Sequence, residues 1–428
     1  MNIFGYEVQR PTAQNVYLGM RAAAAFAFSL VITYELVYHT VVVELNPLQL
    51  VTVGVVLECM TFFFEIPTGV VADLYSRRLS VIIGYCLFGA GFLVEGLFAT
   101  FSAVLIAQVL WGIGFTFYSG AGDAWIADEI GEAQAGPIYL RAAQVSQLMA
   151  LAGVGVGALL VGYGLQWPIL SGATIYLAMV PLLLWFMTEA GFQPAAEHAE
   201  QGIIKRVIAP LQESIQLVRV RPILTTILLV GVVIGLCIGG FDRLEAAHFT
   251  GNFTLPQLGT LEPVAWFSIM SGIIGVLSLI STEFVRRRLD VTSNALVARL
   301  LSALYSGMIV CMLLFALTGS FYLALVAFCV SQTLRNTGRP LLIIWINQNT
   351  RPQVRATVIS MYWQSNAFGQ IVGSPIIGWI GTLFSLRAAL AVGAVIYTAV
   401  LPLLRFAGAN PQVQANDPAS ITKKGMIQ

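Results

Sequence analysis

Long apolar stretches separated by short polar turns dominate this sequence and restrict what it can fold into. A helix needs about 20 mainly apolar residues to cross a ~30 Å hydrocarbon layer, where it satisfies its own backbone polar groups. Twelve stretches reach this length, near residues 15–43, 47–71, 79–98, 101–127, 139–163, 168–188, 222–248, 263–286, 293–317, 320–346, 355–381 and 386–406. We therefore expect an all-α membrane protein with twelve transmembrane helices.

Composition supports a membrane protein. Of the 428 residues 57% are apolar and 10% charged, whereas a soluble domain carries roughly 25% charged residues. The net charge of +1 gives no basic excess that would favour nucleic acid. The odd number of cysteines, all within apolar stretches, argues against a disulfide framework. The first apolar stretch exceeds the roughly 7–15 apolar residues of a signal peptide, so we expect it to remain as a membrane span.

The distribution of basic residues predicts the orientation, because Lys and Arg stay on the cytoplasmic side of a membrane. With the N-terminus inside, only Arg243 and Arg387 fall toward the outer side. The other basic residues fall at or near the inner side, among them Arg10, Arg21, Arg77, Arg78, Arg141, Lys205, Arg206, Arg219, Arg221, Arg286, Arg287, Arg288, Arg299, Arg335, Arg339, Arg351, Arg355, Arg405, Lys423 and Lys424. Both termini are therefore expected in the cytoplasm.

A polar connection at 189–221 divides the chain into a six-helix bundle at 1–188 and another at 222–406. Within the connection, Ile204, Val207, Leu211 and Val218 recur at helical spacing. This pattern predicts an amphipathic helix on the inner membrane surface. Residues 407–428 are polar and unpatterned, which predicts a disordered cytoplasmic tail.

Glycines repeat with one spacing in both halves of the chain. Gly153, Gly157 and Gly162 lie in the fifth stretch, and Gly369, Gly373 and Gly378 lie in the eleventh, half a chain length away. Small residues let helices approach closely in lipid, which explains either run alone. The duplication in addition indicates an internal repeat.

The turn after the second stretch carries a more specific pattern. It reads Glu65-Ile-Pro-Thr-Gly69-Val-Val-Ala-Asp73-Leu-Tyr-Ser-Arg77-Arg78. This resembles the loop between helices two and three of the major facilitator superfamily, Gly-x-Leu-Ala-Asp-Arg-x-Gly-Arg-Lys/Arg. Leu74 and Ser76 replace an Arg and a Gly of that pattern. The resemblance implies two pseudo-symmetric six-helix bundles and a transport function.

Two further family patterns are matched in part. The glycines of the fifth stretch resemble the Gly-x-x-x-Gly-Pro-x-x-Gly-Gly signature of proton-coupled exporters, with Ala158 at the proline position. Gln108, four residues before Gly112, stands where the family places an Arg in helix four. Together these features resemble the twelve-helix drug:proton antiporter-like branch.

Sequence motifs of enzymes are missing. The chain has no Gly-x-x-x-x-Gly-Lys-Ser/Thr loop for ATP, no His-Glu-x-x-His and no Gly-x-Ser-x-Gly, which are patterns of nucleotide, metal and acyl chemistry. We expect no enzyme activity, no cofactor and no metal. With these classes excluded, transport driven by an existing gradient is the remaining function.

Carboxylates inside apolar stretches are the candidates for proton coupling, because a charge in a span is costly and usually faces a cavity or a partner. They are Glu58, Glu65, Glu35 and Asp242. Glu58 lies about eleven residues into the second stretch, near the membrane midplane at 1.5 Å per residue. For Glu58 the possibilities are proton coupling or cation binding on one side and a structural bond to a neighbouring helix on the other. For Glu65 the alternative is a structural role in holding the following turn.

A second set of residues is expected to line a substrate cavity. Arg335 and Arg339 share a helical face and can meet an anionic substrate or opposing carboxylates, although Arg339 can also extend to the inner surface. Trp363, Gln364, Asn366 and Gln370 offer an aromatic wall and hydrogen bonds. Bonding between helices is the alternative for the amides.

Charges also gather at the two ends of the bundle. Gly69, Asp73, Arg77, Arg78 and Asp123 are expected to form a cytoplasmic latch that breaks as the halves rock. The alternative is that both arginines only set the topology. At the outer side, Glu35 and His39 of the first stretch have a loose counterpart in Asp242, Arg243, Glu245 and His248 of the seventh. Asp242 and Arg243 are candidates for an outer gate with the first half.

These features predict a secondary transporter that works by alternating access. We expect proton-coupled efflux of a hydrophobic or amphipathic small molecule by a monomer in the bacterial inner (plasma) membrane. The expected partners are this substrate, protons and the lipid bilayer, without nucleic acid. An importer of a nutrient or organic anion, and a membrane scaffold or receptor that transports nothing, are the alternatives.

Overall fold

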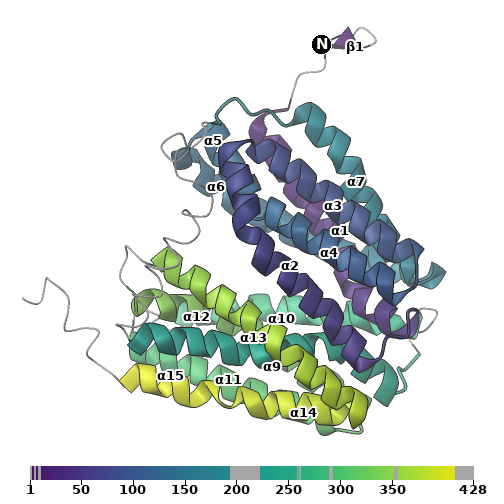
Figure 1. Ribbon diagram of the computed structural model, residues 1–428, viewed down its shortest axis with the longest axis vertical. Coiled ribbons are helices and arrows are strands. Elements are labelled where there is room, and N and C mark those ends of the chain that lie inside the picture. The colour runs from purple at the N-terminus through teal and green to yellow at the C-terminus, as the bar shows by residue number, and fades with distance from the viewer. Residues whose placement is uncertain are drawn as a thin grey trace, which may run out of the picture. The chain divides into compact units, whose positions relative to one another are not determined.

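The computed structural model describes residues 2–3, 6–7, 11–192, 222–257, 259, 262–288, 293–350 and 355–409. Apart from a two-residue antiparallel pair, β1 (Asn2–Ile3) with β2 (Tyr6–Glu7), the regular structure in these ranges is helical (Figure 1). The predicted all-α class is confirmed for the described membrane helices. Most of the expected connection at 189–221 and of the expected tail at 407–428 lies outside the described residues.

The first half of the chain forms six rods. They are α1 (Ala13–Val41), α2 (Pro47–Leu74), α3 (Arg77–Leu97), α4 (Phe101–Tyr118) with α5 (Ala121–Ile130), α6 (Glu132–Leu160) with the 3₁₀ turn η1 (Val161–Tyr163), and α7 (Gln166–Phe186). Side-chain caps start several of them: Thr12, Ser76 and Thr100 each accept a hydrogen bond from the backbone N–H three residues on. Such caps satisfy amides that have no partner within the helix.

The second half continues with α9 (Pro222–Asn252), the 3₁₀ turn η3 (Pro263–Ala265), α10 (Trp266–Arg288), α11 (Asn294–Leu317), α12 (Phe321–Gln348), α13 (Arg355–Leu383), α14 (Leu386–Tyr397) and α15 (Val400–Ala409). Two predicted stretches are interrupted. Gly120, with φ +75°, separates α4 from α5, and a short break separates α14 from α15. The positive φ at residue 120 favours glycine.

Ten helical segments within the described ranges are long and apolar enough to cross a membrane. They include the combined segments Phe101–Ile130 and Leu386–Arg405, while α12 and α13 are of similar length but are not among the ten. Polar side chains such as Arg335 and Asn336 in α12 explain its lower hydropathy. The number of twelve spans and the cytoplasmic termini stay predictions.

The chain packs as two compact units. Unit 1 comprises Met1–Ala209 and Arg243–Gly272, and unit 2 comprises Pro210–Asp242 and Ile273–Gln428. The division therefore falls within α9 and within α10. In unit 1, α1 packs against α6 and α7, and α3 packs against α4 and α7; in unit 2, α11 packs against α12 and α14.

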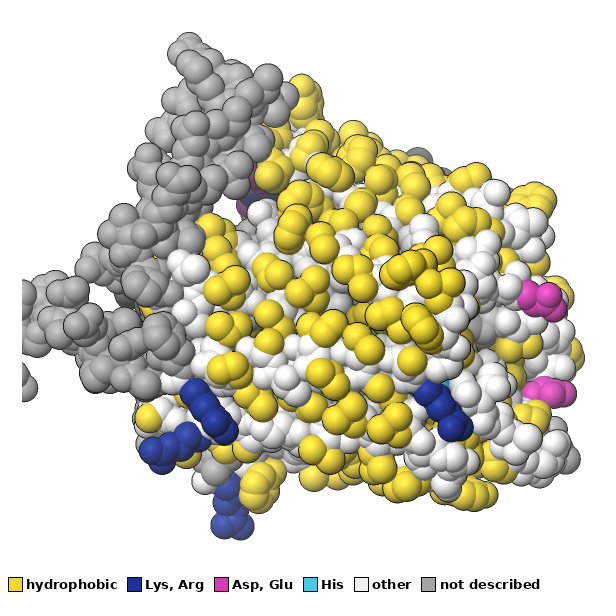
Figure 2. Space-filling model, turned by 60° about the horizontal axis from the view of Figure 1, so that its bottom comes forward, with side chains coloured by type: hydrophobic (Ala, Val, Ile, Leu, Met, Phe, Trp, Pro, Cys, Tyr) yellow, Lys and Arg dark blue, Asp and Glu magenta, His cyan; other side chains and the backbone are white. Residues whose placement is uncertain are grey.

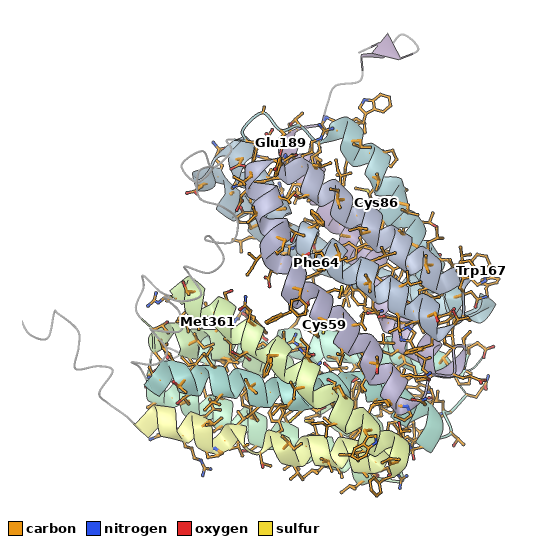
Figure 3. All side chains as sticks on the ribbon, viewed as in Figure 1. Cys59, Phe64, Cys86, Trp167, Glu189 and Met361 are labelled. Atoms are coloured by element: carbon orange, nitrogen blue, oxygen red, sulfur yellow. The ribbon has the colours of Figure 1, made fainter. Side chains whose placement is uncertain are left out.

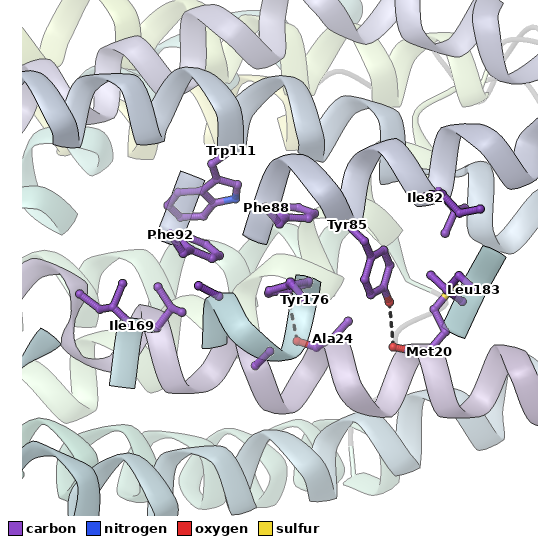
Figure 4. Packing of buried hydrophobic residues seen from close by; sticks show 14 of the residues in the cluster. Met20, Ala24, Ile82, Tyr85, Phe88, Phe92, Trp111, Ile169, Tyr176 and Leu183 are labelled. Atoms are coloured by element: carbon purple, nitrogen blue, oxygen red, sulfur yellow. Dashed lines mark hydrogen bonds between the residues drawn. The ribbon is translucent and has the colours of Figure 1, made fainter. Parts of the chain in front are cut away.

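Aromatic residues form the centre of unit 1 (Figure 4). Tyr176 stacks on Phe88 with ring centroids 5.1 Å apart, and Tyr85 lies edge-on to Tyr176 at 5.5 Å. The hydroxyl groups of Tyr85 and Tyr176 donate to the carbonyl oxygens of Met20 and Ala24, at 2.8 and 3.2 Å. These bonds satisfy buried hydroxyls that would otherwise be costly.

The exterior is apolar to an extent that a soluble protein does not tolerate. Figure 2 shows apolar side chains spread over much of the visible face, with few charged ones. Large apolar residues stand exposed on both units, among them Leu140, Leu159, Ile280, Val310 and Tyr322. Because lipid tails solvate such surfaces, this exterior fits a protein embedded in a bilayer.

The repeated glycines do not share one environment. Gly153 faces the α1 backbone, where an added Cβ would lie 2.6 Å from the Phe26 carbonyl oxygen, and Gly157 faces the Tyr34 ring at 3.0 Å. Gly369 and Gly373 face α9 around Leu236. Gly162 has open space around it, and the carbonyl of Gly378 accepts a bond from Thr382.

We predict that Gly153→Ala lowers the melting temperature of the purified protein in detergent. The added methyl group forces α6 away from α1, and such overpacking costs roughly 1–3 kcal/mol. Gly155→Ala on the same helix is the matched control, because no atom lies within 4 Å of its added Cβ. Equal melting temperatures for the two variants would contradict close α1–α6 packing at Gly153.

Candidate functional site

A pocket opens within unit 2 among α9, α11, α12, α13 and α14. Its walls combine aliphatic, aromatic and basic side chains. The lining residues are Ile234, Ile238, Tyr305, Arg335, Arg339, Leu342, Ile343, Tyr362, Trp363, Asn366 and Tyr397. Apolar walls with a few convergent polar groups are found in small-molecule sites. The volume of about 40 Å³ is below the roughly 300–1,000 Å³ usual for such sites.

Arg335 forms an ion pair with Asp242, so its charge is not free to bind a ligand. Its guanidinium Nη1 donates to both carboxylate oxygens of Asp242, at 2.6 and 2.8 Å. The Arg335 side chain is 17% exposed and the Asp242 side chain 35% exposed. Asp242 was expected from the sequence to couple protons and Arg335 to bind substrate; in unit 2 the two side chains pair with each other.

Arg339 lies one helical turn further along α12 and lines the same pocket. Among the described residues, no carboxylate lies within ion-pair distance of its guanidinium. Nearby are the rings of Tyr305 and Tyr362, which also line the pocket. The pocket therefore carries about one uncompensated positive charge.

The amide residues expected in the cavity are divided between two roles. Asn366 lines the pocket, but its Nδ2 also donates to the carbonyl of Gly231 on α9, at 3.2 Å. Gln370 donates to Asn366 Oδ1 at 3.1 Å and does not line the pocket. Gln364 is partly buried on α13 outside the lining, whereas Trp363 lies in it and is 47% exposed.

Two expected carboxylates lie on α2, the helix that carries the labelled Cys59 and Phe64 in Figure 3. Glu58 is partly buried, and Arg243 is close enough to act on it electrostatically. Glu65 is exposed. Its backbone carbonyl accepts from Thr68 Oγ1 at 3.3 Å, within the part of α2 that contains Pro67 and continues to Leu74.

Glu35 belongs to a buried polar cluster of unit 1 that the sequence analysis assembled only in part. Gln108 Nε2 of α4 donates to Glu35 Oε1 at 2.8 Å, and Arg243 Nη1 lies 4.0 Å from the same oxygen. His39 Nε2 lies 2.8 Å from Oε1 of Glu95 on α3. Glu95 was missed, because it lies near the end of the third stretch, where a carboxylate is ordinarily read as solvated.

The charged residues expected to form one latch lie in two groups in unit 1. Arg77 donates to Asp128 Oδ2 at 2.6 Å and lies 3.8 Å from Asp73 Oδ1. Asp123 instead accepts from the Tyr17 hydroxyl at 2.5 Å, with Arg21 at 4.0 Å. Gly69 lies on α2 with open space around it.

Arg78 and the start of α3 have partners that the sequence did not suggest. The Arg78 guanidinium donates to the carbonyl of Leu184 at 2.5 Å. Glu189, labelled in Figure 3, accepts from the Ser76 hydroxyl at 2.6 Å and from the Arg78 backbone N–H at 3.0 Å. A carboxylate at a helix N-terminus is favourable, so Glu189 ties the end of α7 to the start of α3.

Comparison with known proteins gives a consistent result. The family model described as Major Facilitator Superfamily matches residues 13–370. The uncharacterized MFS-type transporter YxaM of Bacillus subtilis (strain 168) is 22% identical over 377 residues, which are 86% of this chain and 89% of the relative.

Solved structures share the fold at low sequence identity. The nucleoside transporter NupG superposes with a TM-score of 0.74 at 13% identity, over 94% of this chain and 100% of the other. The peptide transporter POT in complex with sulfate reaches 0.71 at 14% identity, over 96% of both chains. A bacterial homolog to the human lysosomal transporter Spinster reaches 0.66 at 12%, over 92% and 94%.

We predict that Asp242→Asn destabilises the protein by roughly 1–3 kcal/mol, between the values for surface and buried pairs. The substitution removes the charge that compensates partly buried Arg335. Adding Arg335→Gln should recover most of the loss, measured as melting temperature in a double-mutant cycle. The control is Glu283→Gln, which removes an exposed pair with Arg286 and should change little. Additive effects of the two substitutions would argue against the Asp242–Arg335 pair.

Proposed function

This chain belongs to the Major Facilitator Superfamily, and from that membership we propose a secondary active transporter that exchanges protons for a hydrophobic or amphipathic small molecule and exports that molecule. The family makes the chain a multi-pass membrane transporter with a small-molecule substrate. Alternating access, proton coupling and the outward direction are our proposals. So are action as a monomer, cytoplasmic termini and a place in the bacterial inner membrane.

The pocket of unit 2 is the observation that carries the substrate class. Three tyrosines, Trp363 and several aliphatic side chains provide apolar and aromatic surface. Asn366 and the two arginines provide only a few polar contacts. Aromatic walls of this kind favour molecules with an apolar body and a small polar group.

Glu58 is our leading candidate for proton coupling. It lies partly buried in the middle of α2, and among the described residues no hydrogen bond to its carboxyl group is found. A carboxyl group in such surroundings exchanges a proton without first breaking an ion pair. Glu35 and Asp242 contact Gln108 and Arg335, and Glu65 is exposed, so each of these three is less suited.

We predict that Glu58→Gln abolishes transport driven by a pH gradient while ligand binding persists. Ligands are first found by a thermal-shift screen of the purified protein against a broad library at two pH values. Uptake into proteoliposomes should then fall at least about tenfold in the variant, because the neutral amide carries no proton. Glu132→Gln, at an exposed position of α6, is the control.

If gradient-driven flux is unchanged in Glu58→Gln, a carboxylate other than Glu58 couples protons to transport. If ligands stabilise the protein but no gradient drives their flux, the protein acts as a scaffold or receptor rather than a transporter. The direction is read from which orientation of the gradient accumulates substrate. Accumulation of substrate on the side toward which protons flow indicates import.

Arg339 favours a second candidate function, the import of a nutrient or organic anion. Its positive charge faces a pocket in which Asp242 already compensates Arg335. The nucleoside and peptide transporters that share the fold make a polar nutrient a reasonable alternative substrate class.

We predict that Arg339→Gln separates the two functions. For an importer of anions, the variant should bind its anion at least about tenfold more weakly, since a charge-assisted hydrogen bond is lost. For an exporter of neutral or cationic amphipaths, affinity should stay the same or rise. Binding is measured by calorimetry or thermal shift, with Arg287→Gln on the exposed end of α10 as control.

A further inference from the structure

Four fully buried polar residues meet in the interior of unit 1. Glu35 and His39 lie one turn apart on α1, Glu95 comes from α3 and Gln108 from α4, and each is 0% exposed. One ligand atom from each of Glu35, His39 and Glu95 can be chosen so that all three lie within 4.8 Å of one another. Gln108 is joined to them by its bond to Glu35.

The cluster does not satisfy itself. Glu35 Oε2, Glu95 Oε2, His39 Nδ1 and Gln108 Oε1 make no hydrogen bond to the described residues, although all four atoms are buried. Buried polar atoms are nearly always paired, and an unpaired buried carboxylate costs several kcal/mol. Three of the four atoms are oxygen acceptors, so the cluster requires positive charge or donors.

The charges reach the same result. If both carboxylates are ionised, they contribute two negative charges against the single positive charge of Arg243, which lies 4.0 Å from Glu35. A single proton would neutralise the remainder but would turn only one acceptor into a donor. An ion that accepts several lone pairs at once satisfies the group as a whole.

We propose that Glu35, His39, Glu95 and Gln108 bind one divalent transition-metal ion such as Zn²⁺. Carboxylate oxygens and an imidazole nitrogen bind such ions at about 2.0–2.2 Å, which places ligand atoms about 3–4 Å apart. The spacing of the three residues is compatible with this range. Imidazole favours a transition metal over Mg²⁺ or Ca²⁺, which prefer all-oxygen sites.

The ion replaces the bond between His39 and Glu95 and uses oxygens that now have no donor. Gln108 contributes its amide oxygen as a neutral fourth ligand, while its Nε2 continues to orient Glu35. Arg243, 14% exposed, keeps its charge toward the edge of the cluster. This inference is independent of the proposed substrate and coupling carboxylate.

The test uses the purified full-length protein, stripped of metal with a chelator and titrated with Zn²⁺ and Co²⁺. We expect one saturable ion per chain and a rise in melting temperature. His39→Gln and Glu95→Gln should each weaken binding by at least about tenfold, and His39→Gln should alter the visible absorption of bound Co²⁺. The matched controls are His248→Gln, a buried histidine of the same unit, and Glu44→Gln, which is exposed.

Gln108→Glu is a second variant, and its expected effect is a gain in stabilisation by Zn²⁺ rather than a loss of binding. A third buried carboxylate should destabilise the metal-free protein, and Zn²⁺ should raise its melting temperature more than that of the wild type. The proposal is overturned if the wild type binds no more metal than Glu95→Gln. It is also overturned if Zn²⁺ has no effect and only acidification stabilises the wild type, which would make the cluster a proton site.

Discussion

The free-energy cost of placing ionised side chains among apolar helices governs the described structure. Each charge there needs a partner or an opening to water, because the hydrocarbon and the packed core supply neither. Arg335 is held by Asp242, Arg77 by Asp128, and Arg21 by the Tyr118 hydroxyl and Asp123. The few charges that lack such compensation are therefore the most informative groups in the molecule.

In the described part of unit 2, Arg339 is a charge without an opposite charge at ion-pair distance. Pairing with Asp242 leaves Arg335 as an anchor that fixes α12 against α9 within the unit. Arg339, one turn away, then contributes the net positive charge of the pocket, beside the tyrosine rings that form its walls. A ligand with an aromatic body gains from those rings whether or not it carries a negative charge, so the pocket walls alone do not decide between export of amphipaths and import of anions.

Apolar run length predicted the membrane class and nearly every helix, because that signal is local and strong. Contacts between distant residues were less predictable. The pair of Glu95 with His39 joins residues on different helices, and nothing near Glu95 in the sequence distinguishes it from a carboxylate at a solvated helix end. Asp123 was grouped with Arg77 from its depth along the chain, yet its position on α5 directs it to Tyr17. The position of a residue along its helix was readable from the sequence, whereas the direction of its side chain around the helix axis was not.

Asp242 and Arg243 illustrate why that direction matters. They are consecutive on α9, so their side chains leave the helix about 100° apart, and each meets an opposite charge within its own unit, Arg335 for Asp242 and Glu35 for Arg243. Exchanging the two residues would leave composition, net charge and hydropathy unchanged. It would nevertheless bring arginine toward arginine and carboxylate toward carboxylate. The order of two residues thus fixes the charge of both the pocket and the buried cluster, and no measure based on composition registers it.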